Sequence, residues 1–174
     1  MANREAIREL QARLAQRLQA ARTEGRAVQW LAVEARGERY LFPLAQAGEI
    51  FSWPLLQPAP YTQPWFLGVA NLRGGLSGVV DLAAFLSGAP TSPDADRADA
   101  SLLTFNAALE LNCALVIDRL AGLRGVEAFT ATEPPAVGEP AYIGPRHTDA
   151  AGLKWREIDL LALSQYPVFL SISA

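Results

Sequence analysis

The chain has 174 residues, 51% of them hydrophobic and 19% charged, so it can bury a sizeable core and does not have the composition of a disordered segment. Its net charge of −3 and the lack of a Lys/Arg run interleaved with aromatic residues argue against nucleic-acid binding. The one cysteine, Cys113, excludes an intrachain disulfide, and no stretch approaches the roughly 20 apolar residues that span a bilayer, so we expect a cytoplasmic protein without membrane insertion.

Residues 1–26 are predicted to form an amphipathic helix. Apolar side chains recur at spacings of three and four residues, while five arginines occupy the other faces of the helix. The apolar stripe consists of Ile7, Leu10, Leu14, Leu18 and Ala21. Such a stripe has to be covered, and the sequence leaves three possibilities open: the helix packs on its own domain, on a copy of itself, or on a partner.

From residue 27 the hydrophobic period changes from a helical one to a period of two, which is typical of strands. Residues 29–34 and 40–42 are predicted to pair as a hairpin, and a third strand is predicted near residues 49–51. A proline-rich loop follows, because Pro54, Pro58, Pro60 and Pro64 resist regular structure.

A second hairpin is predicted between residues 68 and 81, where two apolar runs flank Arg73-Gly74-Gly75. The glycine pair suits a tight reversal because glycine adopts positive φ at little steric cost. Asn71 and Arg73 are the strongly polar side chains that precede the turn. A polar pair in an apolar hairpin is either solvated at an edge or available to a partner.

Residues 88–100 read as a linker, and after it the pattern of the first half starts again. The linker carboxylates Asp94, Asp96 and Asp99 lack the spacing of a calcium loop, so we expect a solvated segment. Residues 102–106 and 112–117 predict another hairpin, residues 119–126 resemble 45–51, and alternation in 166–173 predicts a final strand. The sequence therefore predicts two small strand-rich barrels, the first at about 27–87 and the second at about 101–174.

Chemistry-bearing residues are few and scattered. His147, the one histidine, is expected in a loop, and Cys113 in a buried strand, so neither a metal cluster nor a nucleophile pair is indicated. Asp81 and Asp159 each follow a strand and precede a Leu-rich turn, which is typical of a helix N-cap. We therefore expect no active site, no cofactor and no enzymatic activity.

A family resemblance rests on the second hairpin and the segments around it. The sequence Gly68-Val69-Ala70-Asn71-Leu72-Arg73-Gly74, followed by Val79-Val80-Asp81-Leu82, resembles the signature of the CheW-like adaptor domain of bacterial chemosensory arrays. Trp65-Phe66 and Ala47-Gly48-Glu49-Ile50 fit the same family, and the resemblance covers roughly residues 28–172. It implies an all-β fold of two SH3-like five-stranded small barrels whose terminal strands cross between the halves.

The resemblance also implies a function and a site. CheW-like proteins are non-enzymatic adaptors that couple a methyl-accepting-type chemoreceptor to a CheA-like histidine kinase. The resemblance implies that Glu49 and Arg73 lie on the family's protein-binding surface as a pair that bridges neighbouring strands. The expected site comprises Glu49, Ile50, Val69, Asn71, Leu72, Arg73 and Gly74. The added N-terminal helix and the divergent second half resemble the PilI-like branch, which is associated with type IV pilus (twitching) motility.

Two other classes of function stay open at this stage. A small-ligand-binding or catalytic β-barrel with a site between the halves would need convergent polar residues, of which the sequence offers few. A nucleic-acid-binding barrel would show a steep salt dependence of binding to oligonucleotides.

Overall fold

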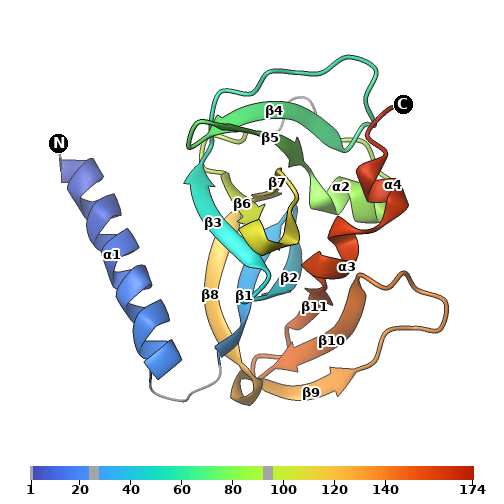
Figure 1. Cartoon of the computed structure of the whole chain (residues 1–174). Coiled ribbons are helices and arrows are strands. Elements are labelled where there is room, and N and C mark those ends of the chain that lie inside the picture. Colours follow the sequence, from blue (N-terminus) through green and yellow to red (C-terminus); the bar gives the residue numbers. More distant parts are fainter. Residues whose placement is uncertain (1, 24–27, 92–95) are drawn as a thin grey trace.

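Strands dominate the computed structural model, which describes residues 2–23, 28–91 and 96–174. A six-stranded sheet, here sheet A, has the order β8-β1-β2-β11-β10-β9, and a five-stranded sheet, sheet B, has the order β3-β6-β7-β5-β4 (Figure 1). The predicted all-β fold with an N-terminal helix is confirmed. The strands of sheet A are β1 (Val28–Ala35), β2 (Glu38–Pro43), β8 (Arg119–Gly125), β9 (Phe129–Glu133), β10 (Ile143–Asp149) and β11 (Lys154–Ile158). Those of sheet B are β3 (Ala47–Ser52), β4 (Phe66–Leu72), β5 (Gly75–Val80), β6 (Ser101–Phe105) and β7 (Cys113–Ile117).

Each sheet is built from both halves of the chain. The β1–β2 hairpin of the first half pairs antiparallel with β8 on one side and parallel with β11 on the other. The β6–β7 hairpin of the second half pairs antiparallel with β3 and parallel with β5. Neither sheet can therefore form from one half alone.

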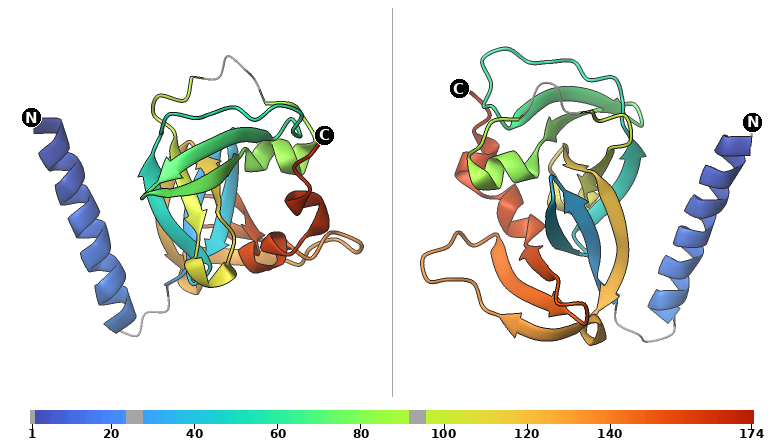
Figure 2. Two further views of the ribbon diagram at one scale, coloured as in Figure 1. Left: turned by 45° about the horizontal axis from the view of Figure 1, so that its top comes forward. Right: turned by 180° about the vertical axis from the view of Figure 1, so that it is seen from behind.

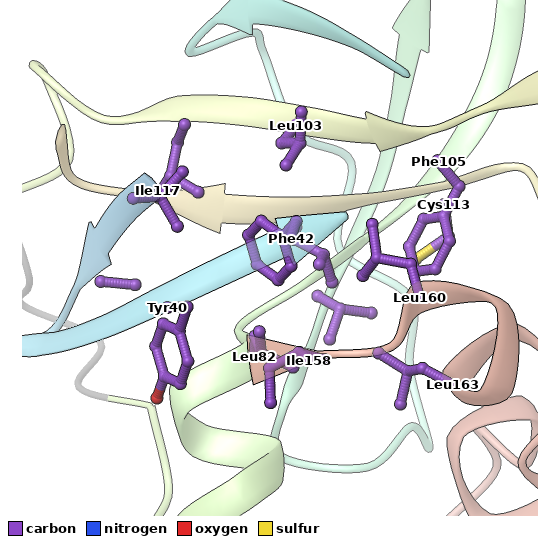
Figure 3. Close-up of a cluster of buried hydrophobic side chains, with 14 of the residues drawn as sticks. Tyr40, Phe42, Leu82, Leu103, Phe105, Cys113, Ile117, Ile158, Leu160 and Leu163 are labelled. Atoms are coloured by element: carbon purple, nitrogen blue, oxygen red, sulfur yellow. The ribbon is translucent and has the colours of Figure 1, made fainter. Parts of the chain in front are cut away.

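The main core lies between the two sheets and follows from the period-two pattern of the strands. One face of each inner strand enters it, as Figure 3 shows for Tyr40 and Phe42 of β2 and for Leu103 and Phe105 of β6. Phe42, Leu103, Leu160 and Leu163 have no exposed surface. Because successive strand residues point to opposite faces, the other faces hold two smaller clusters. Sheet B contributes Ala70, Leu72, Val79, Leu102, Ala114 and Val116, and sheet A contributes Trp30, Ala32, Leu41 and Trp155.

Two short helices cover the open end of the main core, and both begin at the predicted aspartate caps. Asp81 accepts a hydrogen bond from the Ala84 N–H at 3.0 Å at the start of α2 (Leu82–Ser87). Asp159 accepts one from the Ala162 N–H, also at 3.0 Å, at the start of α3 (Leu160–Ser164). Gln46 joins the halves here, because its amide oxygen accepts the Leu160 N–H at 2.7 Å. Two 3₁₀ turns, η1 (Ala107–Leu109) and η2 (Val126–Ala128), complete the connections.

The predicted final strand at residues 166–173 is wrong. The segment instead forms α4 (Pro167–Leu170), which has proline in its first turn, where the missing N–H has no helical partner to lose. The alternation of Val168 and Leu170 suggested a buried strand face, yet both are exposed and Phe169 between them is buried. An isolated β-bridge between Thr62 and Ser173 joins the C-terminal segment to the proline-rich loop.

The N-terminal helix α1 (Ala2–Thr23) lies beside the sheets, as the views of Figures 1 and 2 agree. Of its apolar stripe, Ile7 and Leu10 are 48% and 62% exposed, so the chain's own sheets do not cover them. The side chains of Leu18 and Ala21, the expected boundary at residues 26–27, and Asp94 lie outside the described residues.

Candidate protein-binding site

The β4–β5 hairpin turns at Arg73 and Gly74, one residue earlier than the predicted glycine pair. Leu72 and Gly75 face each other in the register, and the two residues between them have φ of +52° and +79°. Positive φ at both central positions defines a type I′ turn, whose twist matches that of the paired strands. The Asn71 side chain stabilises it by accepting the Gly74 N–H at 2.9 Å. Asn71 is therefore a structural residue of the turn.

Arg73 reaches from this turn to Glu49 of β3. The Arg73 Nη1 and Glu49 Oε1 atoms are 2.8 Å apart, and the two side chains are 74% and 51% exposed. Since β3 and β4 are the outer strands of sheet B, the pair joins the two edges of a curved sheet rather than neighbouring strands (Figure 1). The pair expected from the family pattern thus lies on the surface where sheet B comes closest to closing.

Glu49 is positioned by an irregularity in the pairing of β3 with β6. The register shifts between Ala47 and Ile50, which is the signature of a β-bulge. At the bulge the Thr104 hydroxyl forms the hydrogen bonds of the Glu49 backbone in place of a strand neighbour. It accepts a bond from the Glu49 N–H at 2.8 Å and donates one to the Glu49 carbonyl at 3.2 Å. The backbone of β3 is held in place while the Glu49 carboxylate points outward to Arg73.

The other expected site residues divide by burial. Ile50, which follows Glu49 in β3, is 39% exposed, and Asn71 and Gly74, on either side of Arg73 in the chain, are exposed. Val69 is half-buried and pairs with Gln57 of the proline-rich loop, while Leu72 is 8% exposed and packs in the small cluster of sheet B. The sequence reasoning omitted Leu76, which is 67% exposed and lies directly opposite Asn71. The sequence did contain a signal for Leu76, because the residue directly follows the glycine pair, and side chains at the tip of a hairpin are commonly exposed.

A hollow of about 600 Å³ lies beside the charged pair, and both Glu49 and Arg73 line it. Its walls come from β3, β6, the hairpin turn and the segment around η1, and they include Phe51, Leu111 and Glu110. The hollow therefore joins the exposed charged pair to apolar side chains that are only partly covered, such as Phe51 and Leu111.

The residues with potential chemistry are structural. His147 does not lie in a loop as expected but in β10, where it is buried, with its Nδ1 atom 3.0 Å from Thr132 Oγ1 and its Nε2 atom 2.9 Å from Glu157 Oε2. Cys113 is buried in β7, and burial raises the pKa of its thiol to about 12. In the described ranges no group of three or more His, Cys, Asp or Glu side chains is arranged to hold a metal ion. Nor does any helix described here have the length and apolarity to cross a membrane.

Comparison with known families gives the class of protein that this fold and surface define. The model of the CheW-like domain matches residues 29–145, which is well over half of the chain. The protein belongs to the CheW-like domain family, a family of non-catalytic chemosensory adaptors and scaffolds.

Two relatives refine the picture. The chain is 28% identical over 141 residues to the protein PilI of Pseudomonas aeruginosa, covering 79% of this chain and 75% of PilI, which supports the PilI-like branch. Its fold is similar to that of the scaffolding protein TtCheW from Thermoanaerobacter tengcongensis, with a TM-score of 0.60 and 17% identity over 75% of this chain and 83% of that one. The second likeness concerns the fold alone.

Proposed function

We propose that the protein couples the cytoplasmic tip of a methyl-accepting-type chemoreceptor to a CheA-like histidine kinase, in a pathway that controls chemotaxis or type IV pilus (twitching) motility. The surface around Glu49 and Arg73 binds the CheW-like regulatory domain of the kinase, and a different face binds the receptor. The protein does this work in the cytoplasm, at receptor arrays on the inner membrane, without cofactor and without catalysis.

The observation that carries the proposal is the exposed Arg73–Glu49 pair with exposed aliphatic neighbours. An exposed ion pair adds only about 0–1 kcal/mol to folding stability, so stability alone gives little reason for it. Charged groups beside apolar surface act instead on association, because they steer the encounter and penalise partners with the wrong charge. Ile50, next to Glu49 in the chain, and Leu76, three residues after Arg73, are exposed apolar side chains close to the pair in sequence.

The test is a titration of this protein with the regulatory domain of the CheA-like kinase from the same genome, with a receptor-tip peptide as a second ligand. We expect saturable binding of both, and binding of the kinase domain weakened at least about tenfold by Arg73→Glu. Arg73→Gly is a second variant that is safe for the fold, because glycine suits φ of +52° better than arginine does. It should fold normally and also bind the kinase more weakly.

Arg119→Glu is the matched control. Arg119 is also exposed and also forms an ion pair, at 2.9 Å with the partly buried Glu34, but in sheet A. A double variant, Glu49→Arg with Arg73→Glu, restores the pair with reversed polarity. If the pair only holds the two edges of sheet B together, the double variant recovers binding. If charged groups of the partner contact Glu49 and Arg73 directly, the double variant does not recover binding. Full binding of both single variants at Arg73 would contradict the assignment of the site.

Self-association through α1 also stays a prediction. Its uncovered side chains Ile7 and Leu10 are available to a copy of the chain. Light scattering after gel filtration of the full chain and of a Leu10→Asp variant would show whether a dimer forms and depends on the stripe.

A further inference from the structure

A basic hollow on sheet A lies away from the Glu49–Arg73 surface. It measures about 710 Å³ and is lined by residues of β2, α2, β10, β11 and the segment that leads into β10. Four cationic side chains and two carboxylates line it, in a chain whose net charge is −3. We refer to this hollow as the basic groove; its cationic side chains are Arg39, Arg146, Lys154 and Arg156.

The strand register places two of these cations directly opposite each other. Arg146 of β10 faces Arg156 of β11, and Lys154 lies two residues away from Arg156 on the same face of β11. Like charges directly opposite each other on neighbouring strands destabilise a sheet. The arrangement is therefore a cost to the fold, which Glu139 offsets at Arg156 and a bound anionic group offsets at Arg146.

Ion pairs within the groove indicate that its cations bind carboxylate groups. Three of the four cations have a carboxylate partner: Glu139 Oε2 lies 3.2 Å from Arg156, Glu34 lies 3.7 Å from Arg39, and Glu133 lies 3.9 Å from Lys154. Arg146 has no ion-pair partner among the described residues. A ligand carboxylate could pair with Arg146 in the same way as Glu139 pairs with Arg156. Leu86, Pro140 and Ile143 also line the hollow and are apolar. The groove thus suits a ligand that carries both carboxylates and aliphatic groups.

We propose that the basic groove binds an acidic and partly apolar peptide segment of a partner protein. This goes beyond the proposed function, because the groove belongs to sheet A and shares no residue with the Glu49–Arg73 surface. A peptide is the occupant because it can bring carboxylates to the cations of β10 and β11 and aliphatic groups to the apolar side chains that line the same hollow, whereas a small phosphate makes no use of the apolar part.

The test uses the full chain and a short fluorescent peptide of alternating Glu and Leu, with a matched peptide in which every Glu is Gln. We expect the Glu peptide to bind, the affinity to fall as salt is raised, and the Gln peptide to bind at least about tenfold more weakly. Arg146→Glu should abolish most of the binding. It should also leave the melting temperature unchanged or raise it, because the new carboxylate faces Arg156.

Two comparisons make the test decisive. The arginines of α1 offer a competing basic surface, so a double variant Arg13→Glu with Arg17→Glu is measured in parallel and should bind the Glu peptide normally. Loss of binding in this helix variant, together with normal binding by Arg146→Glu, would overturn the proposal. So would equal binding of the Glu and Gln peptides, or displacement of the peptide by inorganic phosphate at low concentration, since a small-anion site would then explain the groove.

Discussion

At the scale of single residues, Cys113 illustrates how burial determines reactivity. Its thiol faces the core between the sheets, and burial raises its pKa to about 12. The thiolate is the reactive species, so at pH 8 almost none is present in the folded protein. We expect the native protein to resist a thiol reagent such as DTNB and to react promptly in urea. Fast stoichiometric reaction of the native protein would show that the nearby hollow admits the reagent.

Asp149 illustrates a residue that fixes a turn. Its carboxylate accepts hydrogen bonds from the Trp155 indole N–H at 3.0 Å and from the N–H groups of Ala151 and Leu153 at 2.9 Å each. The bond from the Trp155 indole is the main cause that holds the pKa of Asp149 below its usual value of 3.8.

The consequence is a stabilisation that depends on pH. Because the folded-state pKa is the lower one, the stabilisation is complete above the unfolded-state value and is lost as the pH falls through the folded-state value. We expect Asp149→Asn to lower the free energy of unfolding at pH 7 by on the order of 1 kcal/mol. Its stability should also fall less than that of the parent below pH 4. Urea unfolding of both proteins between pH 7 and pH 2.5 measures this, and parallel curves would refute it.

At the scale of elements, two glycines of the family motif carry different constraints. Gly68 has φ of +136°, and a Cβ there would collide with the Gln57 carbonyl, where the proline-rich loop pairs with β4. Gly74 has φ of +79°, and a Cβ there would meet nothing within 4 Å. One position therefore combines backbone strain with a steric clash against backbone, and the other has strain alone.

We expect Gly68→Ala to destabilise the protein by about 2–4 kcal/mol and Gly74→Ala by about 1 kcal/mol. Chemical unfolding of the two variants against the parent measures the difference, which isolates the contribution of the clash. Equal effects would mean that the loop moves away from β4 at little cost.

The elements also show what the sequence reveals and what it hides. The hairpins and the caps at Asp81 and Asp159 were predictable, because strand alternation and capping are local patterns. The segment 166–173 was mispredicted as a strand because Val168 and Leu170 alternate with other residues as in a strand that is buried on one face. Pro167, which favours the first turn of a helix, indicated the correct structure. The place of His147 inside β10 was missed because its neighbours Pro145 and Arg146 suggest a loop.

The site was predictable to a different extent. The charge pair between Glu49 and Arg73 came from the family pattern, whereas the bulge and Thr104, which aim Glu49 outward, depend on the contact of β3 with β6. The β3 and β6 strands lie far apart in the sequence, so no local pattern records their pairing.

At the scale of the whole molecule, each sheet contains a hairpin from the other half of the chain, and we call this arrangement the exchange of hairpins. It affects both the rate of folding and the stability of each half. The β1–β2 hairpin lies between β8 and β11, and the β6–β7 hairpin lies between β3 and β5. Non-local pairings of this kind close long loops before they gain contacts, which slows folding. The main core also draws on both halves, with Phe42 and Leu82 from one and Leu115 and Ile158 from the other. An isolated half would expose edge strands and half of an apolar core.

This arrangement predicts the behaviour of separated halves. We expect a fragment of residues 28–91 and a fragment of residues 96–174 each to lack a cooperative melting transition when expressed alone. Mixed at equal concentration, they should assemble into a complex with the strand content of the parent, because every interrupted pairing can form again between chains. Circular dichroism of the separate and mixed fragments, with gel filtration for the complex, measures this. Independent cooperative folding of either fragment would show that the exchanged hairpins are dispensable and that each half carries a sufficient core of its own.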